Sequence, residues 1–126
     1  MARARIPDVD GRDAVVAALG AHAAGTSAPR DTTAMAVRYT LQLLGELHRG
    51  NSVEVRVPPY GAVQAIEGPR HTRGTPPNVV ETDAATWLAL ATGGLDWDAA
   101  LAGGTVAASG TRADLGSFVP VMQASR

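Results

Sequence analysis

The loop between residues 68 and 78 carries the densest group of side chains that could bind a ligand through charge. Arg70, His71 and Arg73 place two guanidinium groups and an imidazole within four residues. Guanidinium groups form paired hydrogen bonds with phosphate or carboxylate, and the flanking glycines would let backbone amides approach the same anion. We interpret the loop as a candidate site for the polar head of a ligand. The alternative is a solvated loop whose arginines pair with nearby carboxylates.

The other residues with reactive side chains match no catalytic or metal-binding pattern. His22, His48 and His71 have none of the common zinc spacings, and the chain has no cysteine. Asp96 and Asp98 could form a carboxylate pair, but both lie at a predicted helix start, where capping explains them. No nucleophile elbow or phosphate-binding glycine loop is present. We predict no catalytic residue, no metal site and no cofactor, and an enzyme that uses His71 as a base is the less favoured alternative.

The elements that must position these residues begin with two helices. Hydrophobic spacing predicts the first over residues 12–24, with Asp10 or Gly11 as its cap. The second follows a cap at Asp31 or Thr32 and ends before Gly50. Its polar residues form one narrow stripe, so this helix should pack on more than one side.

Strand patterns follow the second helix. Residues 52–57 alternate strictly, with Val53, Val55 and Val57 facing inward, and residues 62–67 return as a second strand after a turn rich in proline. Residues 78–82 and 105–109 read as two more strands. A fifth strand could lie within residues 69–75 or be absent.

Three shorter helices are expected in the last third of the chain. Asp83 caps one that ends at Gly93, Asp96 caps another over residues 97–102, and the last covers residues 112–122, where Pro120 should bend or end it. This order predicts an α+β fold in which a mainly antiparallel sheet of about five strands is covered on one side by helices.

The composition is that of one globular domain without a strong electrostatic partner. The 126 residues are 45% hydrophobic and 18% charged, and the formal net charge is −1. This balance excludes general nucleic-acid binding, and no segment approaches the ~20 apolar residues of a membrane span or resembles a secretory signal. We expect residues 1–10 to form a tail, residues 11–126 to form a single domain, and the protein to be cytoplasmic.

Glycines spaced along residues 78–122 carry a family resemblance. The residues concerned are Gly94-Leu95-Asp96, Ala99, Gly103-Gly104-Thr105-Val106 and Ser109-Gly110. This stretch resembles the C-terminal part of sterol carrier protein 2-like (SCP2-like) domains. The stretches 53–59 and 68–78 resemble the small, stand-alone bacterial version of that domain. Gly94 and Gly104 stand where basic residues often flank the family glycines, which argues against an acyl-CoA head group.

The resemblance implies a protein that binds or carries a lipid in an apolar tunnel between sheet and helices. Arg70, His71 and Arg73 would then lie near the polar head of an acyl chain or similar apolar ligand. Burial of a sixteen-carbon chain would contribute on the order of 10 kcal/mol before ordering costs, at ~0.8 kcal/mol per methylene. The candidate apolar contacts are Leu44, Trp87, Leu90, Phe118, Val119 and Met122.

Two further hypotheses concern protein partners. Related domains occur fused to thiol-dependent isomerases and acetyltransferases, so this chain could be an accessory domain that docks on an enzyme and has a closed core. An exposed strand edge at residues 52–57 could also pair with a second copy to form a homodimer. Trp87 and Trp97 lie on the faces of predicted helices, where we interpret both as core residues, with a ligand contact as the alternative.

Overall fold

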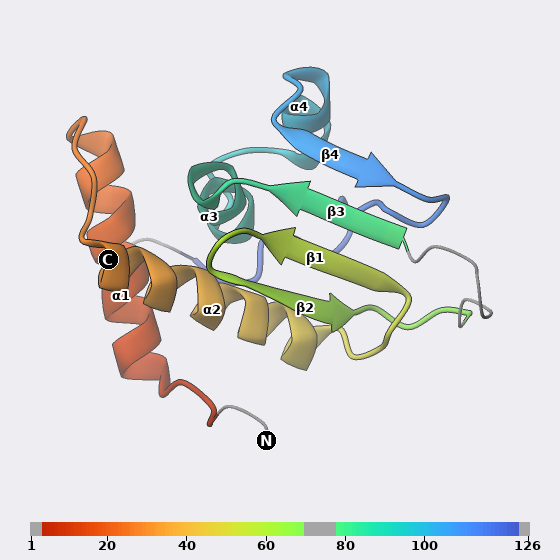
Figure 1. Ribbon diagram of the computed structural model, residues 1–126, viewed down its shortest axis with the longest axis horizontal. Helices are drawn as coiled ribbons and strands as arrows, with labels where there is room; N and C mark the ends of the chain where they lie inside the picture. The colour runs from red at the N-terminus through yellow and green to blue at the C-terminus, as the bar shows by residue number, and fades with distance from the viewer. Residues whose placement is uncertain (1–3, 70–77, 124–126) are drawn as a thin grey trace.

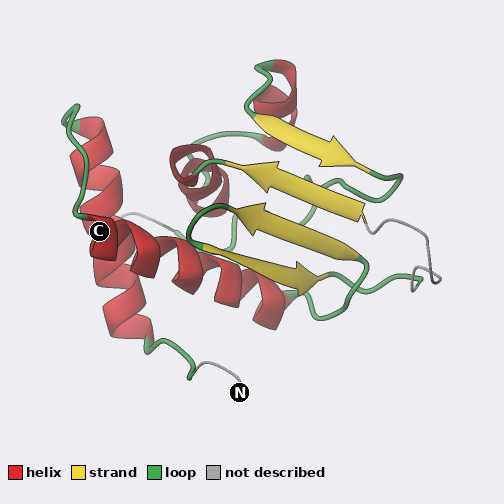
Figure 2. Cartoon of the chain, viewed as in Figure 1, coloured by secondary structure: helices red, strands yellow, loops and turns green. Residues whose placement is uncertain are grey.

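The helices and strands follow one another in blocks along the chain (Figures 1 and 2). The computed structural model describes residues 4–69 and 78–123. In these ranges two long helices come first, three strands follow, and two short helices precede a last strand. The elements are α1 (Asp8–Ala23), α2 (Arg30–Leu47), β1 (Val53–Val57), β2 (Gly61–Ala65), β3 (Asn78–Thr82), α3 (Ala84–Thr92), α4 (Trp97–Ala102) and β4 (Val106–Ser109).

The sheet has the strand order β2-β1-β3-β4 and is mixed. β1 pairs antiparallel with β2, while β3 lies on the other side of β1 and runs parallel to it, with Val53 opposite Asn78. β3 pairs antiparallel with β4. The predicted α+β class is confirmed, and two of the three strand pairings are antiparallel. The described residues form four strands rather than about five, and the pairing of β1 with β3 is parallel. The possible fifth strand within residues 69–75 falls almost entirely outside the described residues.

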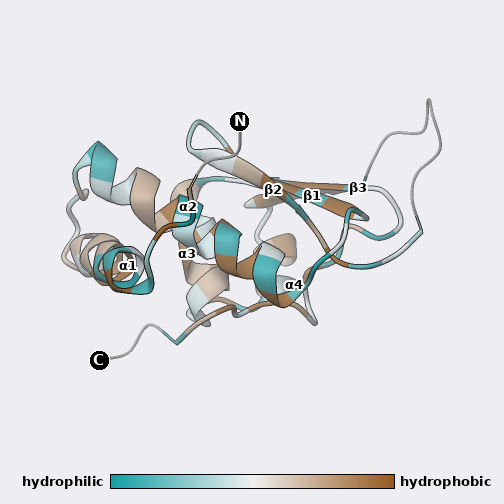
Figure 3. Cartoon of the chain, turned by 90° about the horizontal axis from the view of Figure 1, so that it is seen from below, coloured by the Kyte–Doolittle hydropathy of each residue, from teal (hydrophilic) through white to brown (hydrophobic). Residues whose placement is uncertain are grey.

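The alternation of residues 53–57 places one face of β1 in the core. Val53, Val55 and Val57 are buried, whereas Arg56 on the other face is exposed and donates a 2.9 Å hydrogen bond to Glu54. Figure 3 shows the helices gathered on one side of the sheet. The expected free edge at residues 52–57 is wrong, because β1 has a strand on both sides.

A buried polar contact joins α2 to α3 within the core. Trp87 is fully buried, and its indole Nε1 donates a 2.8 Å hydrogen bond to the Thr40 hydroxyl, which is also fully buried. Tyr39, Leu44 and Leu90 are also fully buried in this core. α2 contacts α1, α3 and β2, so its prediction as a helix that packs on several sides is confirmed.

The first helix begins at Asp8, earlier than its sequence pattern indicates. Pro7 is the residue before the helix, and the proposed caps Asp10 and Gly11 lie inside it. Gly11 is buried against Tyr39, where an added Cβ would lie 2.1 Å from the ring. The missing side chain lets α1 approach α2 closely, so the glycine serves packing rather than capping.

Hydrogen bonds and ion pairs of charged side chains connect the start of α1 to α2. The Tyr39 hydroxyl donates a 2.8 Å hydrogen bond to Asp8, and Arg5 bridges Asp8 and Glu46 with contacts of 3.1 and 2.6 Å. The Tyr39 hydroxyl, followed by Arg5, holds the pKa of Asp8 below its ordinary value. Arg5 lowers the pKa of Glu46 in the same way. Burial, followed by Asp8, raises the pKa of Tyr39.

Helix ends agree in part with the predicted caps. Asp83 accepts a 2.7 Å hydrogen bond from the Thr86 amide, and Gly93 ends α3 with φ 86°, so both predictions are confirmed. Asp96 precedes α4 as expected, but its side chain makes no capping hydrogen bond. α2 starts at Arg30 after Pro29, ahead of the predicted Asp31 or Thr32, because proline fixes φ and needs no amide partner there.

The predicted helix over residues 112–122 is wrong. The chain forms turns there, one of them closed by a 2.7 Å hydrogen bond from the Gly116 amide to Asp114. Leu115 is fully buried, and the amides of Val121 and Met122 both donate to the Ala91 carbonyl at the end of α3. Glycine and proline in this segment disfavour a continuous helix, and contacts with α3 replace the helical hydrogen bonds.

Candidate functional site

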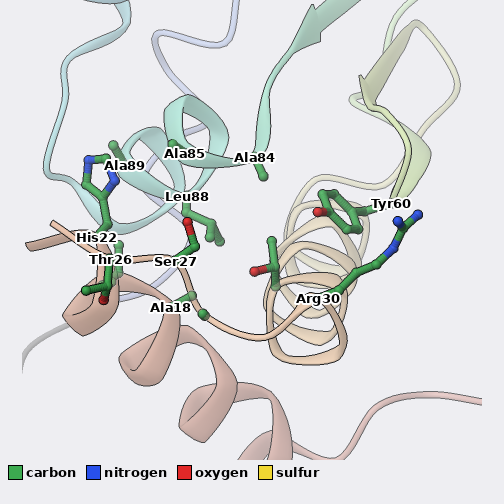
Figure 4. Close-up of a pocket in the computed structure, with 13 residues that line it drawn as sticks. Ala18, His22, Thr26, Ser27, Arg30, Tyr60, Ala84, Ala85, Leu88 and Ala89 are labelled. Atoms are coloured by element: carbon green, nitrogen blue, oxygen red, sulfur yellow. The ribbon is translucent and has the colours of Figure 1, made fainter.

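A pocket of about 410 Å³ opens between the helices, away from the sheet (Figure 4). Its walls come from the C-terminal half of α1, the segment that leads into α2, the first turn of α2 and the exposed face of α3. Tyr60, in the turn between β1 and β2, closes one end. The pocket is therefore assembled from segments that are far apart in the sequence.

Most of the pocket wall is apolar and built from small side chains. α1 supplies Ala18 and Leu19, and α3 supplies Leu88 together with three alanines at positions 84, 85 and 89. Alanine side chains reach only one carbon from the backbone, so two facing helix surfaces made of alanine leave space between them. That space has the chemistry of a binding pocket for an apolar group.

The two ends of the pocket carry its polar side chains. Figure 4 shows Arg30 beside Tyr60 at one end and His22 above Thr26 at the other. Thr33 on the first turns of α2 also lines the pocket. The Thr26 hydroxyl is already occupied, because it donates a 3.1 Å hydrogen bond to the Ala21 carbonyl.

The lining residues give the pocket a positive character. Arg30 and His22 are its two ionisable groups that can carry positive charge, and no aspartate or glutamate belongs to its described lining. Among the residues that the structure describes, no carboxylate lies within ion-pair distance of Arg30. The neighbouring Asp31 lines a different pocket.

Three of the predicted apolar contacts are core residues. Leu44, Trp87 and Leu90 are fully buried, and the space between the sheet and the helices is filled by them and by the valines of β1. Trp97 is also buried. None of the six predicted apolar contacts lines the pocket between α1 and α3.

The remaining predicted apolar contacts lie on the C-terminal segment. Phe118 is half-buried and packs edge-on against His48, with 4.9 Å between the ring centres. Val119 lines a second pocket of about 490 Å³, together with Leu90. This second pocket also carries Asp96 and Asp98, so it is polar and acidic where the first is apolar and basic. Met122 is half-buried where this segment meets the end of α3.

The three residues predicted to hold a polar head, Arg70, His71 and Arg73, lie outside the described residues. Their assignment stays a prediction. Within the described ranges, no group of three histidine or acidic residues is arranged to hold a metal ion. No described helix is both long enough and apolar enough to cross a bilayer.

The sequence pattern does not indicate this pocket, because large apolar side chains supply few of its lining residues. Apart from Leu19, Leu88 and Tyr60, the pocket residues are small or lie near helix ends, and their one signal in sequence is the recurrence of alanine around Leu88. Alanine is abundant throughout this chain, so the signal does not stand out from composition.

Comparison with known proteins places the chain in a family. The model for a family described as bacterial SCP ortholog (SCP_3) matches residues 29–121, which is well over half of the chain and covers α2, the whole sheet and α3. The match begins after α1, so the α1 wall of the pocket lies outside it. No curated protein sequence matches the chain significantly. The chain belongs to the bacterial SCP ortholog family of SCP2-like domains.

Proposed function

We propose that this protein binds and carries a small apolar or amphiphilic molecule in the pocket between α1 and α3. The observation that carries this proposal is the pocket itself, which is apolar along its length and polar at its ends. Its volume of about 410 Å³ falls in the range of small-molecule sites. Membership of an SCP2-like family supports a carrier role.

The helices rather than the sheet form this proposed binding site. The layer between sheet and helices is filled by fully buried side chains, among them Trp87, Leu44 and Val55. A ligand there would have to displace core residues, at a cost of several kcal/mol for each large side chain moved. The pocket between α1 and α3 needs no such displacement.

The proposed role is binding rather than catalysis. A nucleophilic hydroxyl needs an adjacent base to take its proton. Ser27, Thr33 and Tyr60 line the pocket with His22, but the described side chains show no hydrogen bond from any of these hydroxyls to His22. The groups present are suited to holding a molecule in place.

Native mass spectrometry of the purified protein, before and after organic extraction, is the test of a carrier role. We expect a discrete adduct that extraction removes and that an added lipid panel of fatty acids and neutral lipids restores. A protein that carries no adduct and takes up no member of the panel at micromolar concentration would contradict the proposal.

A pair of variants tests the position of the site. Ala85 and Ala99 are both exposed helical alanines, but only Ala85 lines the pocket. Ala85→Phe should fill the pocket and weaken binding at least tenfold, while Ala99→Phe should bind as the unmodified protein does. Circular dichroism and the melting temperature of each variant check that the fold is kept. Equal ligand affinity of the two variants would show that the ligand binds elsewhere.

A further inference from the structure

The second pocket, called the acidic pocket from here on, carries two carboxylates at the start of α4. Asp96 and Asp98 belong to its lining, and both residues are exposed. Among the hydrogen bonds and ion pairs of the described residues, none uses either carboxylate, and Asp96 does not cap α4. The described lining also contains no arginine or histidine. The pocket therefore presents two uncompensated negative charges, which favour a cation.

Trp97, which lies between these aspartates in the sequence, brings a hydrogen-bond donor to the same pocket. The residue is 5% exposed, yet its indole Nε1 donates to no described residue. No described side-chain nitrogen or oxygen is both sealed from solvent and without a partner, so this N–H reaches open space. Gly116 also lines the pocket, and a Cβ added there would lie 3.4 Å from Cδ1 of Trp97, the ring carbon bonded to Nε1. The N–H therefore opens into the acidic pocket and needs an acceptor from outside.

Apolar side chains complete the wall and favour an organic cation over a metal ion. Leu90, Leu95, Val119 and Pro120 line the pocket beside the polar groups. A metal ion would need a shell of oxygen ligands, and the described part of the chain holds no group of three acidic or histidine side chains arranged for one. An organic cation can place its carbon stem against the apolar wall and its charge against the carboxylates.

The size of the pocket matches one basic amino-acid residue. At the roughly 30 Å³ that one water-sized group occupies in a liquid, about 490 Å³ holds about 16 non-hydrogen atoms. An arginine or lysine residue with an amide on each side has a similar number of atoms. Such a residue also supplies both missing partners, because its side chain is a cation and its amide carbonyl is an acceptor.

We infer that the acidic pocket binds a basic residue of a peptide. The cationic group pairs with Asp96 and Asp98, and the carbonyl of an adjoining amide accepts the hydrogen bond of the Trp97 indole. A simple amine or guanidine would satisfy the carboxylates but not the indole. The described linings of this pocket and of the pocket between α1 and α3 share no residue, and α4 lies apart from α1 (Figures 1 and 3). The inference therefore does not depend on the proposed carrier role.

Titration of the full chain with Nα-acetylarginine amide, followed by nuclear magnetic resonance, tests the location. The chain has two tryptophans, so two indole N–H signals are expected. The signal of Trp97 should shift on binding, whereas that of Trp87 should stay, because its N–H donates to the buried Thr40 hydroxyl. The Trp97→Phe variant assigns the two signals by removing one of them. A shift of neither signal, or of the Trp87 signal alone, overturns the inference.

Three further ligands separate the charge from the carbonyl group. Nα-acetylcitrulline amide has the same shape without the charge, butylguanidine has the charge without the amide, and free arginine adds a carboxylate that the aspartates repel. Each should bind at least about fivefold more weakly than Nα-acetylarginine amide. Raising the salt concentration from about 0.01 M to about 0.15 M should weaken Nα-acetylarginine amide more than its citrulline counterpart. Equal affinity for the arginine and citrulline amides, or tighter binding of free arginine, contradicts recognition of a basic peptide residue.

Variants of the pocket wall assign the contacts. Asp96→Asn and Asp98→Asn should each weaken Nα-acetylarginine amide about threefold and leave the citrulline amide unchanged. Asp10→Asn is the matched control, since Asp10 is also exposed in the first turn of a helix but does not line this pocket. Trp97→Phe should weaken Nα-acetylarginine amide and leave butylguanidine, which has no carbonyl, unchanged. Melting temperatures check that each variant keeps its fold. An equal loss for Asp10→Asn, or unchanged affinity when Asp96 and Asp98 are both replaced, overturns the inference.

Discussion

The indole nitrogen of Trp87 donates a 2.8 Å hydrogen bond to the hydroxyl of Thr40, and both side chains are fully buried. The Thr40 hydroxyl in turn lies 2.8 Å from the Ala36 carbonyl, one turn earlier in α2. A polar group of α3 is thus satisfied inside α2, at the centre of an otherwise apolar core. This contact joins α2 to α3, the helix that forms one wall of the candidate pocket.

Removing the Thr40 hydroxyl should destabilise the protein through Trp87. Thr40→Val keeps the shape of the side chain but leaves the indole N–H buried without an acceptor, which costs about 1–3 kcal/mol. Thr40→Ser keeps the hydroxyl and loses one methyl group, so it should cost less. Urea unfolding followed by tryptophan fluorescence measures both. A Thr40→Val variant as stable as Thr40→Ser would show that the hydrogen bond contributes little.

Two glycines of α1 should respond to alanine with opposite signs. Gly11→Ala would place a Cβ 2.1 Å from the Tyr39 ring, so it should destabilise the protein by about 1–3 kcal/mol despite the better helix propensity of alanine. An added Cβ at Gly20 would meet no atom within 4 Å, so Gly20→Ala should stabilise the protein by about 0.5–1 kcal/mol. Thermal melts measure the change in melting temperature of each variant. Equal changes in the two variants would contradict close packing at Gly11.

The caps of the two short helices should differ in strength. Asp83 accepts a hydrogen bond from the Thr86 amide, so Asp83→Ala should cost about 1 kcal/mol. Asp96 occupies the same position before α4 but makes no capping hydrogen bond, so Asp96→Ala should cost clearly less. Chemical unfolding of both variants in one buffer measures the difference. A larger loss for Asp96→Ala would contradict the cap geometry.

Acid should weaken the attachment of α1 to α2 through Asp8. The pKa of Asp8 in the folded protein is lower than its ordinary value of 3.8, so its carboxylate favours the folded state above that pH. This stability is lost as the pH falls through the lower folded pKa, where the folded carboxylate takes up a proton. The unfolding free energy of Asp8→Asn should therefore fall less steeply than that of the unmodified protein as the pH drops below 3.8.

A matched variant checks that this pH dependence comes from Asp8. Asp10 lies in the same first turn of α1 and is exposed, so Asp10→Asn removes an equal charge near the same helix end. Its pH profile should follow that of the unmodified protein more closely than Asp8→Asn does. Matching profiles for the two variants would assign the effect to the helix end rather than to the contacts with Tyr39 and Arg5.

Local patterns were sufficient to predict most elements of the fold. Strict alternation predicts β1 and the inward side of Val53, Val55 and Val57, because side chains of a strand point to opposite faces in turn. Asp83 and Gly93 predict both ends of α3, since capping depends on residues within one turn. The spacing of glycines in residues 78–122 indicates the resemblance to SCP2-like domains.

Pairing across the sheet and the path of the last segment depend on contacts that no local pattern contains. β1 pairs in parallel with β3, although β2 lies between them in the sequence. Residues 112–122 have helical spacing, but they form turns, and the amides of Val121 and Met122 donate to the Ala91 carbonyl. Tertiary packing overrides weak helix propensity in such a segment.

The candidate pocket was decided by tertiary structure alone. The sequence by itself determined the composition of α1 and α3, the buried alternation of β1 and the family to which the chain belongs. Trp87 and Leu44 are fully buried in the core, and neither lines the pocket. Space remains where small side chains of two helices face each other, at Ala18 and Ala85. Only the packing of α1 against α2 and α3 brings those surfaces together.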